Sequence, residues 1–270
     1  MVMFEQLHEN LIEMWDVFDG LCKKYNIPYW LDSGCAIGAV REKDFIPWDD
    51  DIDVAIMRDD FNRLKVVLTQ ELDSKYKLVE PKDYSPYFFD FIPKLIDLTV
   101  PLRSETAEDR AYKNFQNRMS IDFIILDEVP DAKWKQKIIK FKCKFLYGLA
   151  RSKRYHMVYD KKTSCVEKLA GGLCYILGKP FQLETLLKMY ENNTVRYHGI
   201  HSNTIIRSNS LLYFIDFFPK ESYKGTVYMK FHGREVSLPS GYDQILTQMY
   251  GDYMTPVKDY KWFVSHAESN

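Results

Sequence analysis

The feature that most constrains this chain is a run of carboxylates that leads directly into an apolar segment. Residues 49–53 read DDDID and residues 54–56 read VAI, whose β-branched content favours an extended backbone. Side chains alternate between the two faces of a strand, so we expect Asp49, Asp51 and Asp53 on one face and Asp50 on the other. The sequence therefore predicts three carboxylates converging where a buried strand begins.

Carboxylates that lie a few ångströms apart repel one another unless a cation neutralises them. Their hard oxygens suit Mg²⁺ or Mn²⁺, and also Ca²⁺, so Asp49, Asp51 and Asp53 are candidate metal ligands. An EF-hand calcium loop would need glycine where Val54 stands. A solvated acidic turn is the other alternative, and the apolar residues on both sides of the run argue against it. We therefore expect a Mg²⁺ or Mn²⁺ site.

Two further positions upstream of the acidic run indicate that the site binds phosphate. Ser33 and Gly34 mark a turn upstream of the acidic run, and backbone N–H groups at such a turn can hold phosphate oxygens. A Ser-Gly turn that opens a helix, followed by an Asp-x-Asp strand, is the outline of the nucleotidyltransferase fold. That outline requires a third acid on a neighbouring strand, and Asp122, in a predicted strand at 120–125, suits the position.

The remaining pattern predicts an α+β fold, a nucleotidyltransferase-like mixed sheet flanked by helices with a helical insertion. Apolar spacing predicts a helix over 7–21, and β-branched and aromatic residues predict a strand over 87–98. We expect residues 1–130 to form the core, 131–200 a helical insertion or lobe, and 201–270 a closing segment that returns to the core.

The bulk properties exclude several classes of function. The formal net charge of the 270 residues is −1, which disfavours a nucleic-acid partner. No run is apolar enough to span a membrane, although the basic stretch 133–144 and the apolar stretch 169–177 are compatible with peripheral membrane contact. Five cysteines without a CxxC pair indicate free thiols and a cytoplasmic protein, and this location includes the inner face of the membrane. His198 and His201 are weak zinc candidates.

The sequence resembles the LicD family, which includes bacterial phosphocholine transferases and fukutin-type transferases. The resemblance rests on LDSGCAIGAVR at 31–41 and FIPWDDDIDV at 45–54, on a second acidic block at 121–127, and on a closing pattern at 231–254. Cys35 stands where the family commonly has threonine, which removes a hydroxyl near the phosphate turn. The helical middle of the chain is not covered.

The resemblance implies metal-dependent transfer of a phosphate-linked group. The expected reaction moves phosphocholine from CDP-choline to a sugar hydroxyl of a cell-surface glycan precursor, of the teichoic acid or lipopolysaccharide type. The alternatives are another CDP-alcohol or nucleotide-sugar donor, and a catalytically idle protein that binds a nucleotide or choline.

The residues expected at this site fall into three groups. The predicted catalytic acids are Asp51, Asp53 and Asp122, the predicted metal ligands are these three and Asp49, and the predicted donor-binding residues are Ser33, Gly34, Arg41 and Lys94. Asp122 either completes the metal shell or takes the proton from the acceptor hydroxyl, and we favour the second role.

Overall fold

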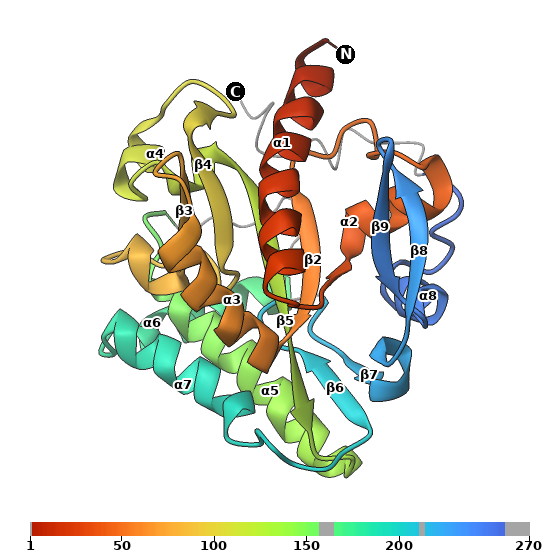
Figure 1. Ribbon diagram of the computed structural model, residues 1–270. Coiled ribbons are helices and arrows are strands. Elements are labelled where there is room, and N and C mark those ends of the chain that lie inside the picture. The colour runs from red at the N-terminus through yellow and green to blue at the C-terminus, as the bar shows by residue number, and fades with distance from the viewer. Residues whose placement is uncertain (1, 157–164, 211–213, 257–270) are drawn as a thin grey trace.

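A mixed seven-stranded sheet forms the centre of the molecule (Figure 1). The computed structural model describes residues 2–156, 165–210 and 214–256. Strand β5 is the longest strand and pairs in parallel with β2, whereas all other pairs are antiparallel. The strands of this sheet are β1 (Trp30–Leu31), β2 (Ile52–Met57), β3 (Tyr76–Val79), β4 (Lys94–Pro101), β5 (Arg118–Val129), β6 (Thr204–Arg207) and β7 (Phe217–Pro219).

Strand β5 pairs with β2 and with two further strands, β4 and β6, one after the other along its length. Strand β4 pairs with the first residues of β5 and β6 with its last residues, while β3 and β7 extend these two branches. A separate hairpin is formed by β8 (Thr226–Phe231) and β9 (Arg234–Pro239). This architecture is the α+β, nucleotidyltransferase-like mixed sheet flanked by helices that the sequence predicts.

Helices cover both faces of the sheet. Helix α1 crosses the front face in Figure 1, next to α3, and the rings of Phe18 from α1 and Phe61 from α3 lie 5.7 Å and 5.5 Å from the ring of Phe123 on β5. The α-helices are α1 (Val2–Lys24), α2 (Ser33–Ile37), α3 (Arg58–Glu71), α4 (Ala107–Ala111), α5 (Lys133–Ala150), α6 (Cys165–Gly178), α7 (Leu183–Val195) and α8 (Tyr242–Tyr250). The helix predicted over 7–21 is confirmed as part of α1.

The strand predicted over 87–98 is only half right, because β4 begins at Lys94. The apolar residues before it, Phe88 and Phe91, are buried against α5 and α7 instead of pairing in the sheet. Asp90 accepts a hydrogen bond from the N–H of Ile92 at 2.9 Å, which holds the segment in a turn. Tertiary packing therefore overrides the β propensity of this stretch.

The described parts of the chain between 131 and 200 form α5, α6 and α7. Helix α5 packs against both α6 and α7, below and to the left of the sheet in Figure 1. The chain then returns to the sheet through β6. The buried side chain of Asn209 extends the hydrogen bonding of β5, because it accepts from the N–H of Ile125 at 2.8 Å and donates to the carbonyl of Phe123 at 2.7 Å. Among the described residues, no helix is long and apolar enough to cross a bilayer.

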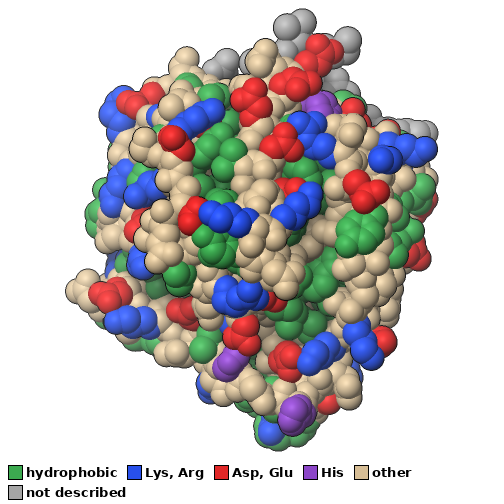
Figure 2. Space-filling model, viewed as in Figure 1, with side chains coloured by type: hydrophobic (Ala, Val, Ile, Leu, Met, Phe, Trp, Pro, Cys, Tyr) green, Lys and Arg blue, Asp and Glu red, His purple; other side chains and the backbone are tan. Residues whose placement is uncertain are grey.

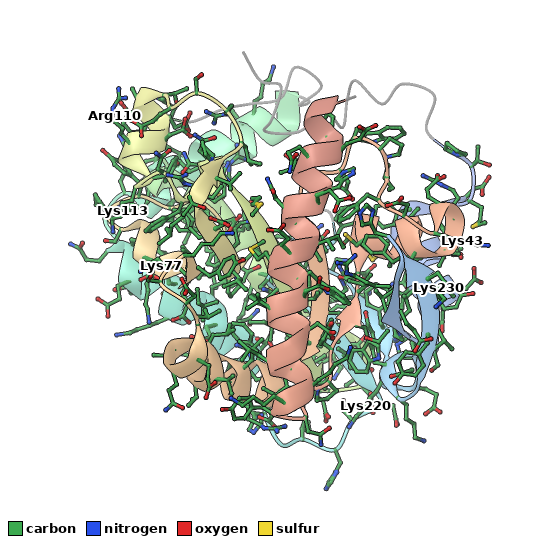
Figure 3. All side chains as sticks on the ribbon, turned by 45° about the horizontal axis from the view of Figure 1, so that its top comes forward. Lys43, Lys77, Arg110, Lys113, Lys220 and Lys230 are labelled. Atoms are coloured by element: carbon green, nitrogen blue, oxygen red, sulfur yellow. The ribbon has the colours of Figure 1, made fainter. Side chains whose placement is uncertain are left out.

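Charged side chains are dispersed over the surface. Acidic and basic groups are interspersed on the face shown in Figure 2, without a continuous area of one sign. Figure 3 shows exposed cations at well-separated points around the molecule: Lys43, Lys77, Arg110, Lys113, Lys220 and Lys230. This distribution agrees with the near-zero net charge and offers no basic stripe on the viewed face for a nucleic-acid backbone.

Candidate active site

The centre of the candidate site is a row of three side chains across three neighbouring strands. Asp53 on β2 stands directly opposite Asp122 on β5, and Asp122 stands opposite Lys94 on β4. Residues in register across a sheet have their side chains on the same face. The fold therefore brings two carboxylates and one ammonium together from segments that are far apart in the sequence.

Other carboxylates of the acidic run lie beside this row. Asp51, Asp53 and Asp122 can each direct a carboxylate oxygen to within 4.8 Å of the others, and Asp49, Asp50 and Asp51 form a second such group. Because β2 begins only at Ile52, the strand alternation predicted for Asp50 does not extend to it, and its carboxylate joins those of its neighbours. Asp51 belongs to both groups and links them.

Gly34 is required because the Asp49 carboxylate packs against it. A Cβ at position 34 would lie 2.4 Å from Oδ2 of Asp49, closer than atoms of these types approach. The preceding Ser33 has a φ of 47°, an unusual backbone conformation for a residue other than glycine. The β1–β2 pairing and the hydrogen bond from the N–H of Asp32 to the carbonyl of Asp53, 2.9 Å long, hold this turn beside the acids.

Lys94 holds Asp122 in place and is not free to reach a distant phosphate. Its ammonium contacts Oδ2 of Asp122 and lies 3.9 Å from Oδ2 of Asp90, and Ser120 donates a 2.6 Å hydrogen bond to the other oxygen of Asp122. Burial lowers the pKa of Lys94, but the two carboxylates raise it well above its ordinary value, so the side chain stays charged.

Burial and mutual repulsion affect the carboxylates of the acidic run. Burial, followed by the charges of the other acids, raises the pKa of Asp51 and of Asp53 well above the ordinary range. Burial and the charge of Asp50 raise the pKa of Asp49 to about 7. Within the described residues, no lysine or arginine forms an ion pair with Asp51 or Asp53. The nearby Lys94 lowers the pKa of Asp53, but burial and the neighbouring acids outweigh this effect.

A buried ion pair between Asp32 and Arg207 supports the turn at Ser33 and Gly34. The sequence did not indicate this pair. The Arg207 side chain is fully buried, and its two terminal nitrogens each lie 2.6 Å from an oxygen of Asp32. Arg207 is the last residue of β6, so the ion pair connects β6 to Asp32, the residue before Ser33. A polar pair 175 residues apart in sequence leaves no local pattern that could reveal it.

All eight residues that the sequence proposes line one cavity of about 650 Å³: Ser33, Gly34, Arg41, Asp49, Asp51, Asp53, Lys94 and Asp122. The rest of its wall is unusually aromatic, with Trp48, Phe89, Tyr112, Tyr147, Phe214, Tyr250 and Tyr253. The sequence showed that aromatic residues are abundant but not which of them gather here. The cavity thus combines an acidic end with an aromatic wall.

Two arginines stand in the cavity wall. Arg41 donates through Nη1 to the carbonyl of Tyr253 at 2.8 Å and pairs through Nε with Glu42. Arg154, which the sequence reading missed, donates to the carbonyl of Phe89 at 2.9 Å, and its buried Nε has no hydrogen-bond partner. Arginine in such a position can bind phosphate oxygens, because its several N–H groups remain available in fixed geometry.

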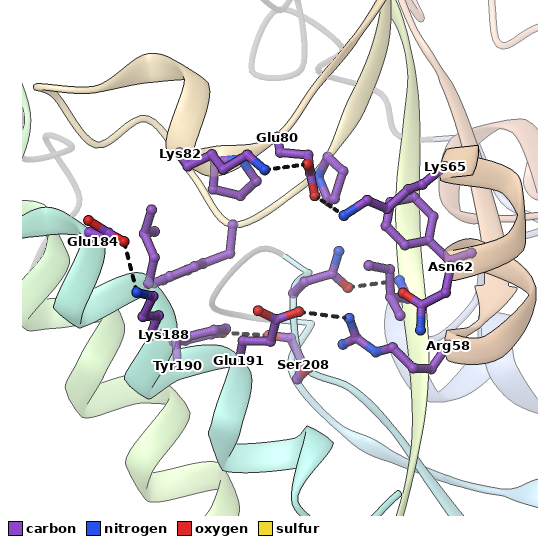
Figure 4. Close-up of a pocket in the computed structure, with 17 residues that line it drawn as sticks. Arg58, Asn62, Lys65, Glu80, Lys82, Glu184, Lys188, Tyr190, Glu191 and Ser208 are labelled. Carbon is purple, nitrogen blue, oxygen red and sulfur yellow. Dashed lines mark hydrogen bonds and ion pairs between the residues drawn. The ribbon is translucent and has the colours of Figure 1, made fainter. Parts of the chain in front are cut away.

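A second cavity of about 280 Å³ lies on the other side of β5 (Figure 4). It is lined by Ile125, whereas the acidic cavity is lined by Ile124. Its charged side chains are paired with one another: Lys65 with Glu80, Lys188 with Glu184, and Arg58 with Glu191. We therefore identify the acidic cavity, and not this one, as the candidate active site.

The acidic end of the larger cavity fits a divalent cation. Oδ2 of Asp49 and Oδ2 of Asp50 are buried without a hydrogen-bond partner, and the two acidic groups together offer oxygen ligands only. Such oxygens suit Mg²⁺ or Mn²⁺. His198 lies 3.6 Å from exposed Asp59, and the described residues contain no histidine or cysteine group that suits zinc.

Comparison with known proteins shows similarity to one family. Residues 26–89 match the family described as LicD/FKTN/FKRP, nucleotidyltransferase domain. The chain is 29% identical over 255 residues to the lipopolysaccharide cholinephosphotransferase LicD of Haemophilus influenzae, and the match covers 93% of this chain and 91% of that protein.

Shorter matches fall on uncharacterized proteins of two Rickettsia species. One from Rickettsia typhi is 41% identical over 64 residues, covering 24% of this chain and 21% of that protein. One from Rickettsia prowazekii is 48% identical over 50 residues, covering 18% and 19%. The chain is thus similar to LicD-family proteins, the family that its motifs resemble.

Proposed function

We propose that this protein is a LicD-type, metal-dependent transferase that moves phosphocholine from CDP-choline to a sugar hydroxyl of a cell-surface glycan precursor. The observation that carries the proposal is the convergence of Asp51, Asp53 and Asp122 in a cavity that is also lined by aromatic side chains. The nearly full-length likeness to a lipopolysaccharide cholinephosphotransferase supports a phosphotransferase activity and a glycan acceptor.

The cation would be held mainly by Asp51 and Asp53, with Asp49 beside them. These carboxylates have raised pKa values, first because they are buried and then because of each other's charges, which is the signature of a site that lacks its counter-charge. A bound Mg²⁺ or Mn²⁺ would offset the charge that develops on the phosphate oxygens during transfer. Asp122 already has Lys94 as its counter-charge and so contributes less to the affinity for the cation.

The reaction needs a nucleophile, a leaving group and a proton acceptor. The acceptor hydroxyl forms a new bond to the choline-bearing phosphorus, the bond from that phosphorus to the bridging oxygen breaks, and CMP leaves with the electron pair. We assign the hydroxyl proton to Asp122, which Ser120 and Lys94 fix in one orientation. Arg41 and Arg154 in the cavity wall supply donors for the phosphates of the nucleotide.

The aromatic wall supports choline as the transferred group. A quaternary ammonium binds over aromatic faces by cation–π attraction and needs no hydrogen-bond donor. Phe214 and Tyr250 lie side by side in the wall, with ring centroids 5.1 Å apart. The carboxylates of Glu108 and Asp252 also border the cavity and add negative charge for a cationic group.

The test is CMP release with Mg²⁺ and a glycan acceptor across a panel of CDP-choline, CDP-ethanolamine and CDP-glycerol. CDP-choline should be the best substrate, and the variant Asp53→Asn should release CMP at least about 100-fold more slowly. The matched control is Asp59→Asn, an acid whose side chain is 71% exposed on α3. Preference for another donor would agree with a phosphotransferase activity but would contradict choline as the transferred group.

Combining this assay with thermal unfolding distinguishes an enzyme from a catalytically idle binding protein. A ligand that binds only the folded state raises the melting temperature by mass action. The enzyme should show both a higher melting temperature with Mg²⁺ and CDP-choline and release of CMP, and EDTA should reverse both. Stabilisation without any release of CMP would identify an idle binding protein.

A further inference from the structure

Helix α5 exposes four large apolar side chains to solvent. Trp134, Ile138, Phe141 and Phe145 are 64%, 44%, 67% and 39% exposed. Their spacing of four, three and four residues places them within an arc of about 60° on the helix. The rings of Phe141 and Phe145 stack 6.0 Å apart and nearly parallel. These residues form one continuous apolar stripe, which we call the α5 stripe.

The α5 stripe is not the side of the helix that packs into the protein. Ile139, Cys143 and Leu146 are buried on the opposite side, in the cluster that α5 shares with α7. An ordinary surface helix buries one apolar face and presents polar residues outward. Helix α5 instead carries a second apolar face directed away from the core, and large exposed apolar patches mark binding surfaces.

Lysines flank the α5 stripe on both sides. The helix contains six lysines and no acidic residue, in a chain whose formal net charge is −1. By helical rotation, Lys133, Lys137 and Lys144 lie on one side of the stripe and Lys135 and Lys142 on the other. Apolar and aromatic groups between two rows of lysines match a bilayer surface, where the lysines meet anionic headgroups and the apolar groups enter the interface.

The neighbouring helix α6 enlarges the surface. It exposes Leu169, Leu173, Ile176 and Leu177, which are 78%, 58%, 65% and 44% exposed. Close packing joins the two helices, because a Cβ at Gly148 of α5 would lie 2.9 Å from Sγ of Cys174 on α6. The exposed apolar side chains of α5 and α6 therefore belong to two helices that pack against each other.

We propose that α5 and α6 dock this protein onto an anionic membrane surface. The charge pattern of α5 favours a lipid surface over a second copy of the chain, since two copies would bring their lysines together. This inference stands on residues outside the acidic cluster and does not depend on the choice of donor. It deepens the proposed function in one respect. Tyr147, in the last turn of α5, lines the active-site cavity, so docking would hold the cavity close to the membrane.

The test is co-sedimentation of the full chain with vesicles of equimolar phosphatidylglycerol and phosphatidylcholine, compared with pure phosphatidylcholine. We expect binding to the anionic vesicles that weakens with added salt. The double variant Trp134→Ser/Phe141→Ser should bind at least about tenfold more weakly while its melting temperature is unchanged, because both side chains are mostly exposed. The control is Tyr228→Ser, an aromatic residue that is 68% exposed on β8 and should leave binding unchanged.

Three results would overturn the proposal. The first is equal vesicle binding by the double variant and the wild type. The second is binding to pure phosphatidylcholine that the double variant retains, which would assign the contact to the choline-binding cavity. The third is a wild-type dimer in analytical ultracentrifugation that the double variant disperses, without vesicle binding, which would assign the face to a second copy. CMP release from soluble substrates tests the proposed function separately, because none of these changes touches the cavity.

Discussion

Replacing Asp49 by asparagine should stabilise the protein in the absence of metal, and more so at higher pH. Burial, with the charge of Asp50, raises the pKa of Asp49 from 3.8 to about 7. An acid with a raised pKa holds its proton more tightly when folded, so folding loses stability as the pH rises between these two values. Above both values the loss reaches about 4 kcal/mol, less what solvent contact of the partly exposed side chain screens.

The assay is chemical unfolding in EDTA at about pH 5 and about pH 8.5. The advantage of Asp49→Asn over the wild type should be about 2–3 kcal/mol larger at the higher pH, because the charge is then fully developed. Excess Mn²⁺ should reverse the order, since the wild type gains more from binding the cation. Asp59→Asn serves as the exposed control. An advantage that does not change with pH would show that the Asp49 carboxylate is well solvated and would refute the reasoning.

Three further predictions follow from named contacts. Asp122→Asn should leave Mn²⁺ affinity nearly intact in calorimetry but slow single-turnover chemistry by about 10²–10⁴-fold, and a large loss of affinity would make it a ligand instead of the base. Gly34→Ala, whose Cβ would lie 2.4 Å from Oδ2 of Asp49, should weaken Mn²⁺ binding by about tenfold or more with little change in melting temperature. Arg207→Met should lower the free energy of unfolding by about 3–5 kcal/mol in urea titrations by leaving the Asp32 charge buried alone, and the added change Asp32→Leu should recover part of this loss.

Much of the site could be predicted because its residues are close in sequence or follow a simple rule. The run DDDID next to an apolar strand locates most of the carboxylates, and the Ser-Gly turn follows the same outline. Asp122 could be predicted because the nucleotidyltransferase outline requires a third acid on a neighbouring strand, and in the structure it stands opposite Asp53. Local patterns of this kind are fixed by backbone geometry, which sequence reading captures well.

The rest of the site depends on tertiary packing, which leaves weak traces in sequence. The ion pair of Arg207 with Asp32 depends on the pairing of β6 with β5. The position of Arg154 in the cavity wall depends on where α5, the helix before it, ends. Lys94 was predicted to bind the donor phosphates, yet its ammonium is engaged by Asp122 and Asp90. Asp50 was predicted to point away, but the acids before Ile52 lie outside β2, where strand alternation does not hold.

The central claim is that the acidic cluster drives transfer of phosphocholine, and the most direct measurement follows the group itself. CDP-choline labelled in the choline moiety is incubated with the protein, Mg²⁺ and a purified lipopolysaccharide acceptor, and the acceptor is then isolated and analysed by mass spectrometry. The account predicts labelled phosphocholine on the acceptor together with an equal amount of CMP, both lost with EDTA and with Asp53→Asn but retained by Asp59→Asn. Transfer that persists undiminished in EDTA or in Asp53→Asn would contradict it.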